Sequence, residues 1–231
     1  MKKTLVYDGS FDGFLSAVYR VFEEQLKDVE IVKPKHYQPN IFIESEEIVT
    51  DARMAKRVWQ GLQLKVTKSV ANRLYASFLS EIKGVENVLL RYILFAYCSE
   101  SYNHADYSNT DVLRVLQVSK MVFRERDRME AIVNFQLTKD GIYFAEIEPD
   151  FNVLPLLLRH FENKYSDRPW IIFDKKRQVG VHGQNGISRW VDAKEFYSRT
   201  SRFARQDHSG PLFLDANHMR ITRNDQLKSV V

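Results

Sequence analysis

The sequence predicts an α+β fold, with a mainly antiparallel sheet, helices packed on it and a helical insertion. Apolar residues recur at spacings of three and four along most of residues 50–128, which is the helical pattern. After residue 130 the spacing changes to two in a pair of segments, each with turn residues at its middle, and this predicts two β-hairpins. A short apolar strand opens the chain, and we expect it to join the sheet that the hairpins form.

The N-terminal region predicts a strand, a helix and a second strand. Residues 3–8, "KTLVYD", have the composition of a strand. Residues 11–25 then place a row of apolar side chains on one face of a helix, at Phe14, Leu15, Val18, Val21 and Phe22. Residues 29–34, "VEIVKP", predict a second strand that Pro34 ends, and a polar connection follows over residues 36–47.

The middle of the chain predicts four helices, which make up the expected insertion over residues 50–128. The first covers residues 50–61, with Thr50 as its N-cap and Gly61 as its end. Residues 69–84 and 85–100 predict a helical hairpin that breaks at Gly84. The fourth helix is longer and covers residues 110–129.

The second half predicts two hairpins on either side of one helix. Residues 130–149 alternate about a turn at Lys139-Asp140-Gly141, and residues 169–183 alternate about a turn at Asp174–Arg177. Between them, residues 152–165 have the apolar spacing of a helix. After Gly183 the pattern weakens and basic residues increase. We therefore expect one domain over residues 1–182 and a basic extension over residues 183–231.

Composition excludes some classes of protein. The chain holds no uncharged apolar stretch as long as a membrane-spanning helix, so we expect a cytoplasmic protein without a membrane segment. The single cysteine, Cys98, excludes a disulfide framework and a cysteine-based zinc site within one chain, and its apolar surroundings predict a buried thiol. The net charge of +4 permits contact with nucleic acid without requiring it.

The opening turn, "YDGSFDG", carries acidic and hydroxyl side chains at the start of a helix, and two interpretations stay open. Ser10 or Asp12 can cap the helix, since acidic and hydroxyl groups suit the positive end of a helix. Alternatively, Asp8 and Asp12 form a small acidic site that binds a divalent metal or supplies a general base. The glycine patterns of phosphate and dinucleotide sites are absent, so we expect no other cofactor.

The helix over residues 110–129 carries a row of basic and polar side chains opposite its apolar face: Arg114, Gln117, Arg124 and Arg128. Such a row can contact the phosphate backbone of a nucleic acid. It can also be a solvated face whose charges pair with acids such as Glu125. His160 lies just outside the apolar stripe of the helix over residues 152–165, where a histidine serves either as a packing residue or as a base.

Two blocks of the sequence resemble a bacterial family catalogued as DNA repair or DNA metabolism proteins of unknown function. The first block is "YDGSFDGFLSAVYRVFE". The second is residues 126–180, and the positions in step with the family pattern are Arg128, Met129, Phe135, Tyr143, Pro149, Asn152–Pro155, His160, Phe161, Trp170, Asp174 and Arg177. Together the blocks and the helices between them span residues 5–180, whereas the last part of the chain matches only loosely.

The resemblance implies a genomic setting rather than a mechanism. Members are typically encoded beside a radical-SAM protein, and some longer relatives carry a fused uracil-DNA glycosylase domain, so this chain is similar to the short form. It implies no catalytic residues, and the oligomeric state stays open. We therefore expect a DNA-binding accessory protein that cooperates with a radical-SAM enzyme. The alternatives are a glycosylase or nuclease that uses Asp8, Asp12 and His160, and an adapter that binds only the radical-SAM protein.

Overall fold

The computed structural model describes residues 2–99, 102–138 and 141–192, so residues 193–231 of the extension predicted over residues 183–231 lie outside them. The chain divides into two compact units, Met1–Met121 and Val122–Val231. The described residues form six α-helices and two sheets, which confirms the α+β class. No helix among them is long and apolar enough to span a membrane.

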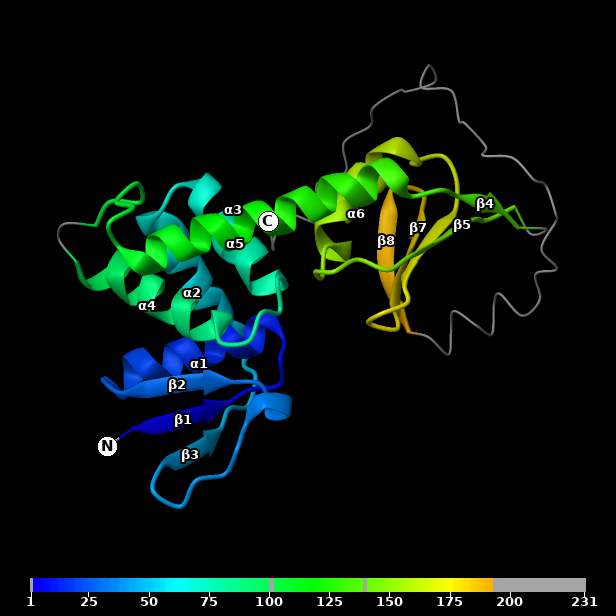
Figure 1. The fold of residues 1–231 in the computed structure, drawn as a ribbon. Helices are drawn as coiled ribbons and strands as arrows, with labels where there is room; N and C mark the ends of the chain where they lie inside the picture. Colours follow the sequence, from blue (N-terminus) through cyan, green and yellow to red (C-terminus); the bar gives the residue numbers. More distant parts are fainter. Residues whose placement is uncertain (1, 100–101, 139–140, 193–231) are drawn as a thin grey trace. The chain divides into compact units, whose positions relative to one another are not determined.

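The first unit contains a small parallel sheet (Figure 1). Its strands are β1 Lys3–Val6, β2 Val29–Val32 and β3 Glu44–Glu47, in the order β2-β1-β3. Both neighbours run parallel to β1, and helix α1, Phe11–Glu23, connects β1 to β2. The expectation that the N-terminal strand joins the sheet of the hairpins was therefore wrong. Because a helix connects β1 to β2, the two strands lie side by side in parallel and form a separate sheet.

Three further helices of the first unit are α2 Ala52–Lys65, α3 Lys68–Leu79 and α4 Val85–Cys98. A single turn of 3-10 helix, η1 Pro34–His36, follows β2. Helix α2 differs from the prediction at both ends. Its N-cap is Asp51, and it continues past Gly61, where a Cβ would overlap the hydroxyl of Tyr97 on α4. Gly61 is needed for this close approach and does not end the helix.

The core of the first unit lies between α1 and the helices next to it. Phe11 contacts the rings of Trp59 and Phe78 at centroid distances of 5.1 and 5.0 Å, which joins α1 to α2 and α3. Leu5 and Ile31, opposite each other on β1 and β2, are fully buried. Cys98, at the end of α4, is exposed, so the predicted burial of its thiol was wrong.

Helix α5, Thr110–Ile132, begins in the first unit and ends in the second, and it confirms the long helix predicted over residues 110–129. The second unit continues with a five-stranded sheet in the order β4-β5-β6-β7-β8. These strands are β4 Gln136–Leu137, β5 Tyr143–Ile147, β6 Trp170–Asp174, β7 Val179–Gln184 and β8 Ile187–Asp192, with helix α6 Leu154–Lys164 between β5 and β6.

The pairing in this second sheet is mainly antiparallel. The hairpins β4–β5 and β6–β7 are confirmed, and β5 pairs with β6 in parallel across α6. Strand β8 adds a third antiparallel pair beyond the predicted domain boundary at residue 182, which falls inside β7. Trp170 is buried, and a Cβ on Gly183 of the neighbouring strand would overlap its indole ring. Glycine at position 183 therefore makes room for the largest side chain of this core.

Candidate functional site

The opening turn is organised by Asp8, which follows β1. One oxygen of its carboxylate accepts hydrogen bonds from the backbone N–H of Ser10 at 2.8 Å and from the Ser10 hydroxyl at 2.7 Å. Its other oxygen accepts from the hydroxyl of Thr50 at 2.8 Å. Ser10 in turn accepts from the N–H of Gly13 at 2.9 Å, so Ser10 is the N-cap of α1. The capping interpretation is confirmed for Ser10, and Asp8 holds that cap in place.

The environment of Asp8 favours its ionised form. Partial burial acts to raise the pKa of its carboxyl group, but the hydrogen bonds from Ser10 and Thr50 outweigh that effect and the pKa lies below its ordinary value. Asp12 is exposed in the first turn of α1. Among the residues that the structure describes, no group of three or more His, Cys, Asp or Glu side chains is placed to hold a metal. A role for Asp8 and Asp12 as metal ligands or bases therefore stays a prediction.

Gly13→Ala should destabilise the first unit by about 2 kcal/mol, although alanine is the better helix former. A Cβ at position 13 would overlap a carboxylate oxygen of Asp8 and lie 2.9 Å from the Thr50 hydroxyl. The carboxylate would have to move and give up its hydrogen bonds to Ser10. Urea denaturation of the variant measures the loss. In an Asp8→Ala background the same substitution should cost clearly less, and an equal cost in both backgrounds would contradict this account.

A second polar group lies beneath the opening turn and is almost completely buried. The hydroxyl of Tyr7 donates to the carboxylate of Glu86 at 3.0 Å, and the ammonium of Lys33 lies 3.7 Å from the same carboxylate. Burial and the negative charge of Glu86 raise the pKa of Tyr7, so this phenol stays neutral. These three residues connect the strand ends to the start of α4 and carry no reactive group toward solvent.

The predicted basic row is exposed on α5. Arg114 and Gln117 belong to the first unit, and Arg124 and Arg128 belong to the second. Lys120 is exposed beside them. Within the described part of the chain, Arg114, Lys120 and Arg124 have no acidic partner.

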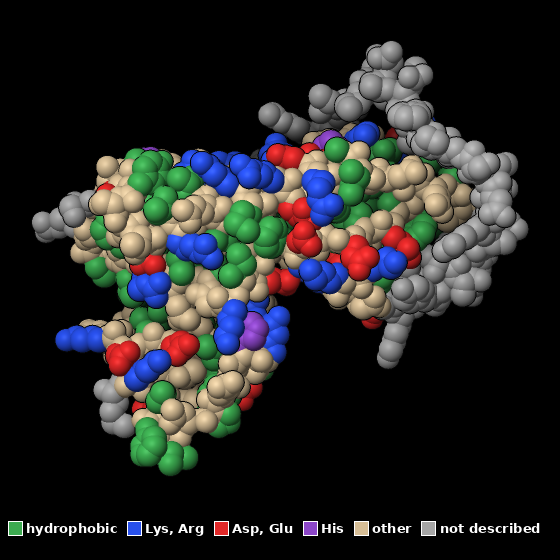
Figure 2. Space-filling view, viewed as in Figure 1, with side chains coloured by type: hydrophobic (Ala, Val, Ile, Leu, Met, Phe, Trp, Pro, Cys, Tyr) green, Lys and Arg blue, Asp and Glu red, His purple; other side chains and the backbone are tan. Residues whose placement is uncertain are grey.

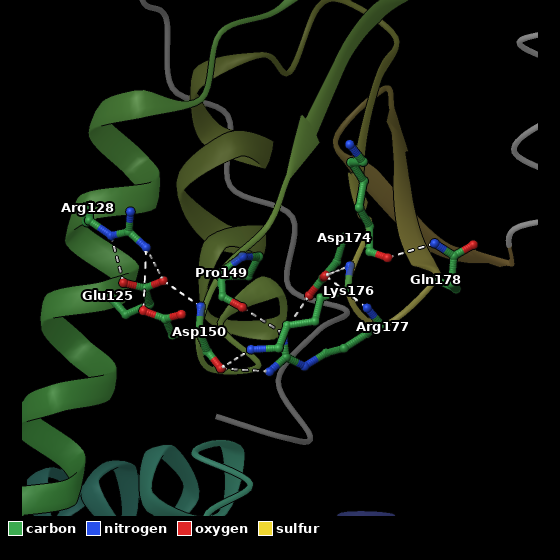
Figure 3. A network of polar contacts seen from close by, with 9 residues as sticks. Glu125, Arg128, Pro149, Asp150, Asp174, Lys176, Arg177 and Gln178 are labelled. Atoms are coloured by element: carbon green, nitrogen blue, oxygen red, sulfur yellow. Dashed lines mark hydrogen bonds and ion pairs between the residues drawn. The ribbon is translucent and has the colours of Figure 1, made fainter.

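Arg128 differs from the other arginines of the row because it is paired. Its guanidinium donates to both carboxylate oxygens of Glu125, at 2.8 and 2.6 Å, and holds the pKa of Glu125 below its ordinary value. Glu125 also accepts from the N–H of Asp150 at 2.8 Å (Figure 3). Arg128 therefore has a structural role near the end of α5. The interpretation of the row as a surface whose charges pair with acids applies to Arg128 but not to Arg114 or Arg124.

The turn between β6 and β7 contributes the rest of the network in Figure 3. Asp174 is fully buried and accepts from the backbone N–H groups of Lys176 and Arg177 and from the Arg177 guanidinium at 2.9 Å. The same guanidinium donates to the carbonyls of Pro149 and Asp150, each at 3.2 Å. The network thus fixes the β6–β7 turn to the loop before α6.

His160 lies on α6 in the second unit, so it belongs to a different unit from Asp8 and Asp12. Its Nδ1 atom is 3.7 Å from a carboxylate oxygen of Glu130, and its ring packs against Phe161 at a centroid distance of 4.9 Å. Its Nε2 atom is buried and has no hydrogen-bond partner within the described residues. These contacts fit a packing residue at the edge of the core, and a role as a base stays a prediction.

Helix α2 carries a basic face that the motifs considered in the sequence did not predict. Arg53, Lys56 and Arg57 are exposed there. Figure 2 shows Lys and Arg side chains over the helices of the first unit with few Asp or Glu side chains among them. The signal was present in the sequence, because residues 52–80 contain six basic residues and no Asp or Glu.

A family model described as a domain of unknown function, DUF4130, matches residues 83–218, which is more than half of the chain. The chain belongs to the DUF4130 family. No curated protein matches it. The DUF4130 match includes α4, α5 and the whole second sheet, and with them the basic row of α5 and His160. Asp8, Asp12 and the basic face of α2 precede the DUF4130 match.

Proposed function

We propose that this DUF4130 protein binds DNA and acts as an accessory factor in DNA repair or DNA modification. One observation carries the proposal: Arg114 and Lys120 in the first unit and Arg124 in the second are exposed on α5, and no described acidic side chain pairs with them. Cations without an internal partner are free to exchange their counterions for phosphate oxygens, which is the main source of affinity for nucleic acids.

The spacing of these cations suits a phosphate backbone. Arg114 and Lys120, both in the first unit, are six residues apart, which corresponds to about 9 Å along a helix. A duplex carries one negative charge per ~1.7 Å of its axis, so a row of that length meets several phosphates. Gln117, on the same face, can add a neutral hydrogen bond to a phosphate or a base edge.

The double substitution Arg114→Ala/Arg124→Ala should weaken binding to every duplex about equally. Loss of two phosphate contacts should reduce the slope of log K against log salt concentration by about 2. Fluorescence anisotropy with labelled random-sequence duplexes measures both quantities. Lys27→Ala/Lys175→Ala removes the same charge at exposed positions elsewhere and serves as the matched control. Equal slopes for the two double variants would show that α5 does not contact phosphate.

The proposed cooperation with a radical-SAM enzyme rests on the family resemblance alone. It is tested by repeating the titration with the radical-SAM protein encoded beside this chain. An accessory factor should raise the affinity of the radical-SAM protein for DNA. Independent binding of the two proteins would remove that part of the proposal.

A second candidate function, an adapter that binds only protein, is favoured by one observation. Ile41 and Phe42, adjacent in the loop before β3, are 94% and 82% exposed. Large apolar side chains that stand together in solvent are typical of protein-binding surfaces. A stable complex with the radical-SAM protein, without DNA binding by either this chain or the complex, would favour the adapter over the accessory factor.

A further inference from the structure

Helix α2 has an unusual charge distribution for a surface helix. Residues 52–80, which include α2 and α3, carry Arg53, Lys56, Arg57, Lys65, Lys68 and Arg73 and no acidic residue. In a chain whose basic and acidic residues number 34 and 30, such a segment concentrates positive charge locally. Surface helices of soluble proteins usually mix both signs, so an acid-free basic helix indicates an anionic partner.

The basic residues of α2 form one exposed face. Arg53, Lys56, Arg57 and Gln60 are spaced as on one side of a helix and are all exposed, with the Arg53 side chain 90% exposed. The Arg53 guanidinium forms an ion pair with Asp51 at 3.7 Å. Lys56 and Arg57 have no acidic partner in the described part of the chain.

The opposite face of α2 is packed inside the first unit, which fixes the direction of the basic face. Ala55, Val58, Trp59 and Leu62 are buried. Asp51 caps the helix by accepting from the N–H groups of Arg53 and Met54, at 2.8 and 3.2 Å, and its own N–H donates to Ser16 of α1. The cations therefore stand on a rigid element, and binding to them costs little backbone entropy.

We propose that the exposed face of α2 is a second DNA-contacting surface, which binds the phosphates of a duplex through Arg53, Lys56 and Arg57. This inference rests on the proposed DNA-binding function and adds a surface outside the DUF4130 match. A helix with its side chains is about 10–12 Å across, which fits the ~12 Å width of the major groove, and the face from Arg53 to Gln60 extends about 10 Å along the helix. Gln60 and Gln63, further along the same face, are suited to hydrogen bonds with base edges.

Two other anionic partners fit this face less well. Single strands are held largely by stacking on aromatic rings, and the one aromatic residue of α2, Trp59, is buried. An anionic membrane would need an apolar face to insert, but the apolar face of α2 is packed against α1. Among the large apolar side chains of α2, Leu64 is exposed, and a single exposed leucine does not form an apolar face.

The test compares the full chain with the triple variant Arg53→Ala/Lys56→Ala/Arg57→Ala. We expect the variant to keep the wild-type melting temperature within a few degrees, since these side chains point to solvent. We expect the magnitude of its slope of log K against log salt concentration to be smaller by about 3. We expect its affinity for duplex to fall at least tenfold. Lys27→Ala/Lys35→Ala/Lys175→Ala, which removes three positive charges at exposed positions elsewhere, is the control for loss of charge.

The outcomes separate this inference from the proposed function. Duplex binding by the wild type that the triple variant retains overturns the inference and leaves DNA binding intact. Absence of duplex binding by the wild type overturns both. If an unlabelled single strand of equal length competes better than duplex, or if vesicles of anionic lipid bind the wild type but not the variant, the assignment of a duplex is wrong. Loss of duplex binding confined to the triple variant supports it.

Discussion

Asp174→Ala is expected to lower the free energy of unfolding of the second unit by about 3–5 kcal/mol, the cost of removing one partner of a buried ion pair. Asp174 is fully buried and accepts three hydrogen bonds, two from the backbone of the β6–β7 turn and one from the Arg177 guanidinium. The side chain of Arg177 is only 13% exposed. Without the carboxylate, two backbone N–H groups and the guanidinium lose an acceptor in a place that water reaches poorly.

Urea denaturation followed by far-UV circular dichroism measures this loss. Asp174→Asn, which keeps an oxygen for the two backbone N–H groups, should lose less than Asp174→Ala. Asp167→Ala is the matched control, because Asp167 is exposed and pairs with half-buried Arg168 near the surface, and such pairs contribute about 0–1 kcal/mol. A stability of Asp174→Ala within 1 kcal/mol of that control would show that the network in Figure 3 does not hold the turn.

Glu86→Ala should destabilise the first unit by a similar amount, about 3–5 kcal/mol. The side chains of Glu86 and Lys33 are 4% and 10% exposed, and the Tyr7 hydroxyl donates to the same carboxylate. The substitution leaves a buried ammonium group without its counterion and a buried hydroxyl without its acceptor. The free energy of unfolding in urea is again the measured quantity.

A second substitution distinguishes loss of the ion pair from loss of packing. Lys33→Met removes the unpaired charge and keeps the side-chain volume, so Glu86→Ala/Lys33→Met should be more stable than Glu86→Ala alone. If instead the two losses add, the ion pair does not account for the effect. Recovery in the double variant would confirm that Lys33 pairs with Glu86 in the native protein.

Most elements were predictable because their signals are local. The helix over residues 110–129 and both hairpins follow from the spacing of apolar residues and from turn residues such as Gly141 and Asp174. Strand β3, Glu44–Glu47, was missed because "ESEE" has no apolar alternation. It is a strand because its backbone pairs with β1. Strand β1 belongs to a separate parallel sheet because it pairs with distant segments. The spacing of apolar residues within one segment does not indicate which strands will pair.

In the candidate sites too, features set by neighbouring residues could be predicted, and contacts between residues far apart in sequence could not. The cap at Ser10 could be predicted from residues 8–13, but the bond from Thr50 to Asp8 brings together residues far apart in sequence. The exposure of the α5 row followed from helical periodicity, whereas the pairing of Arg128 with Glu125 could be resolved only with rotamers in place. The basic face of α2 was visible in the composition of residues 52–80, and counting acids along each predicted helix would have found it.

The central claim is that this chain binds DNA through exposed cations on its helices, and one titration tests it most directly. Binding of the full chain to a labelled random-sequence duplex is measured between about 50 and 200 mM salt. Six phosphate contacts, three on each of α5 and α2, predict a slope of log K against log salt near −5. Absence of binding at the lowest salt, or binding that does not change with salt, would contradict the claim.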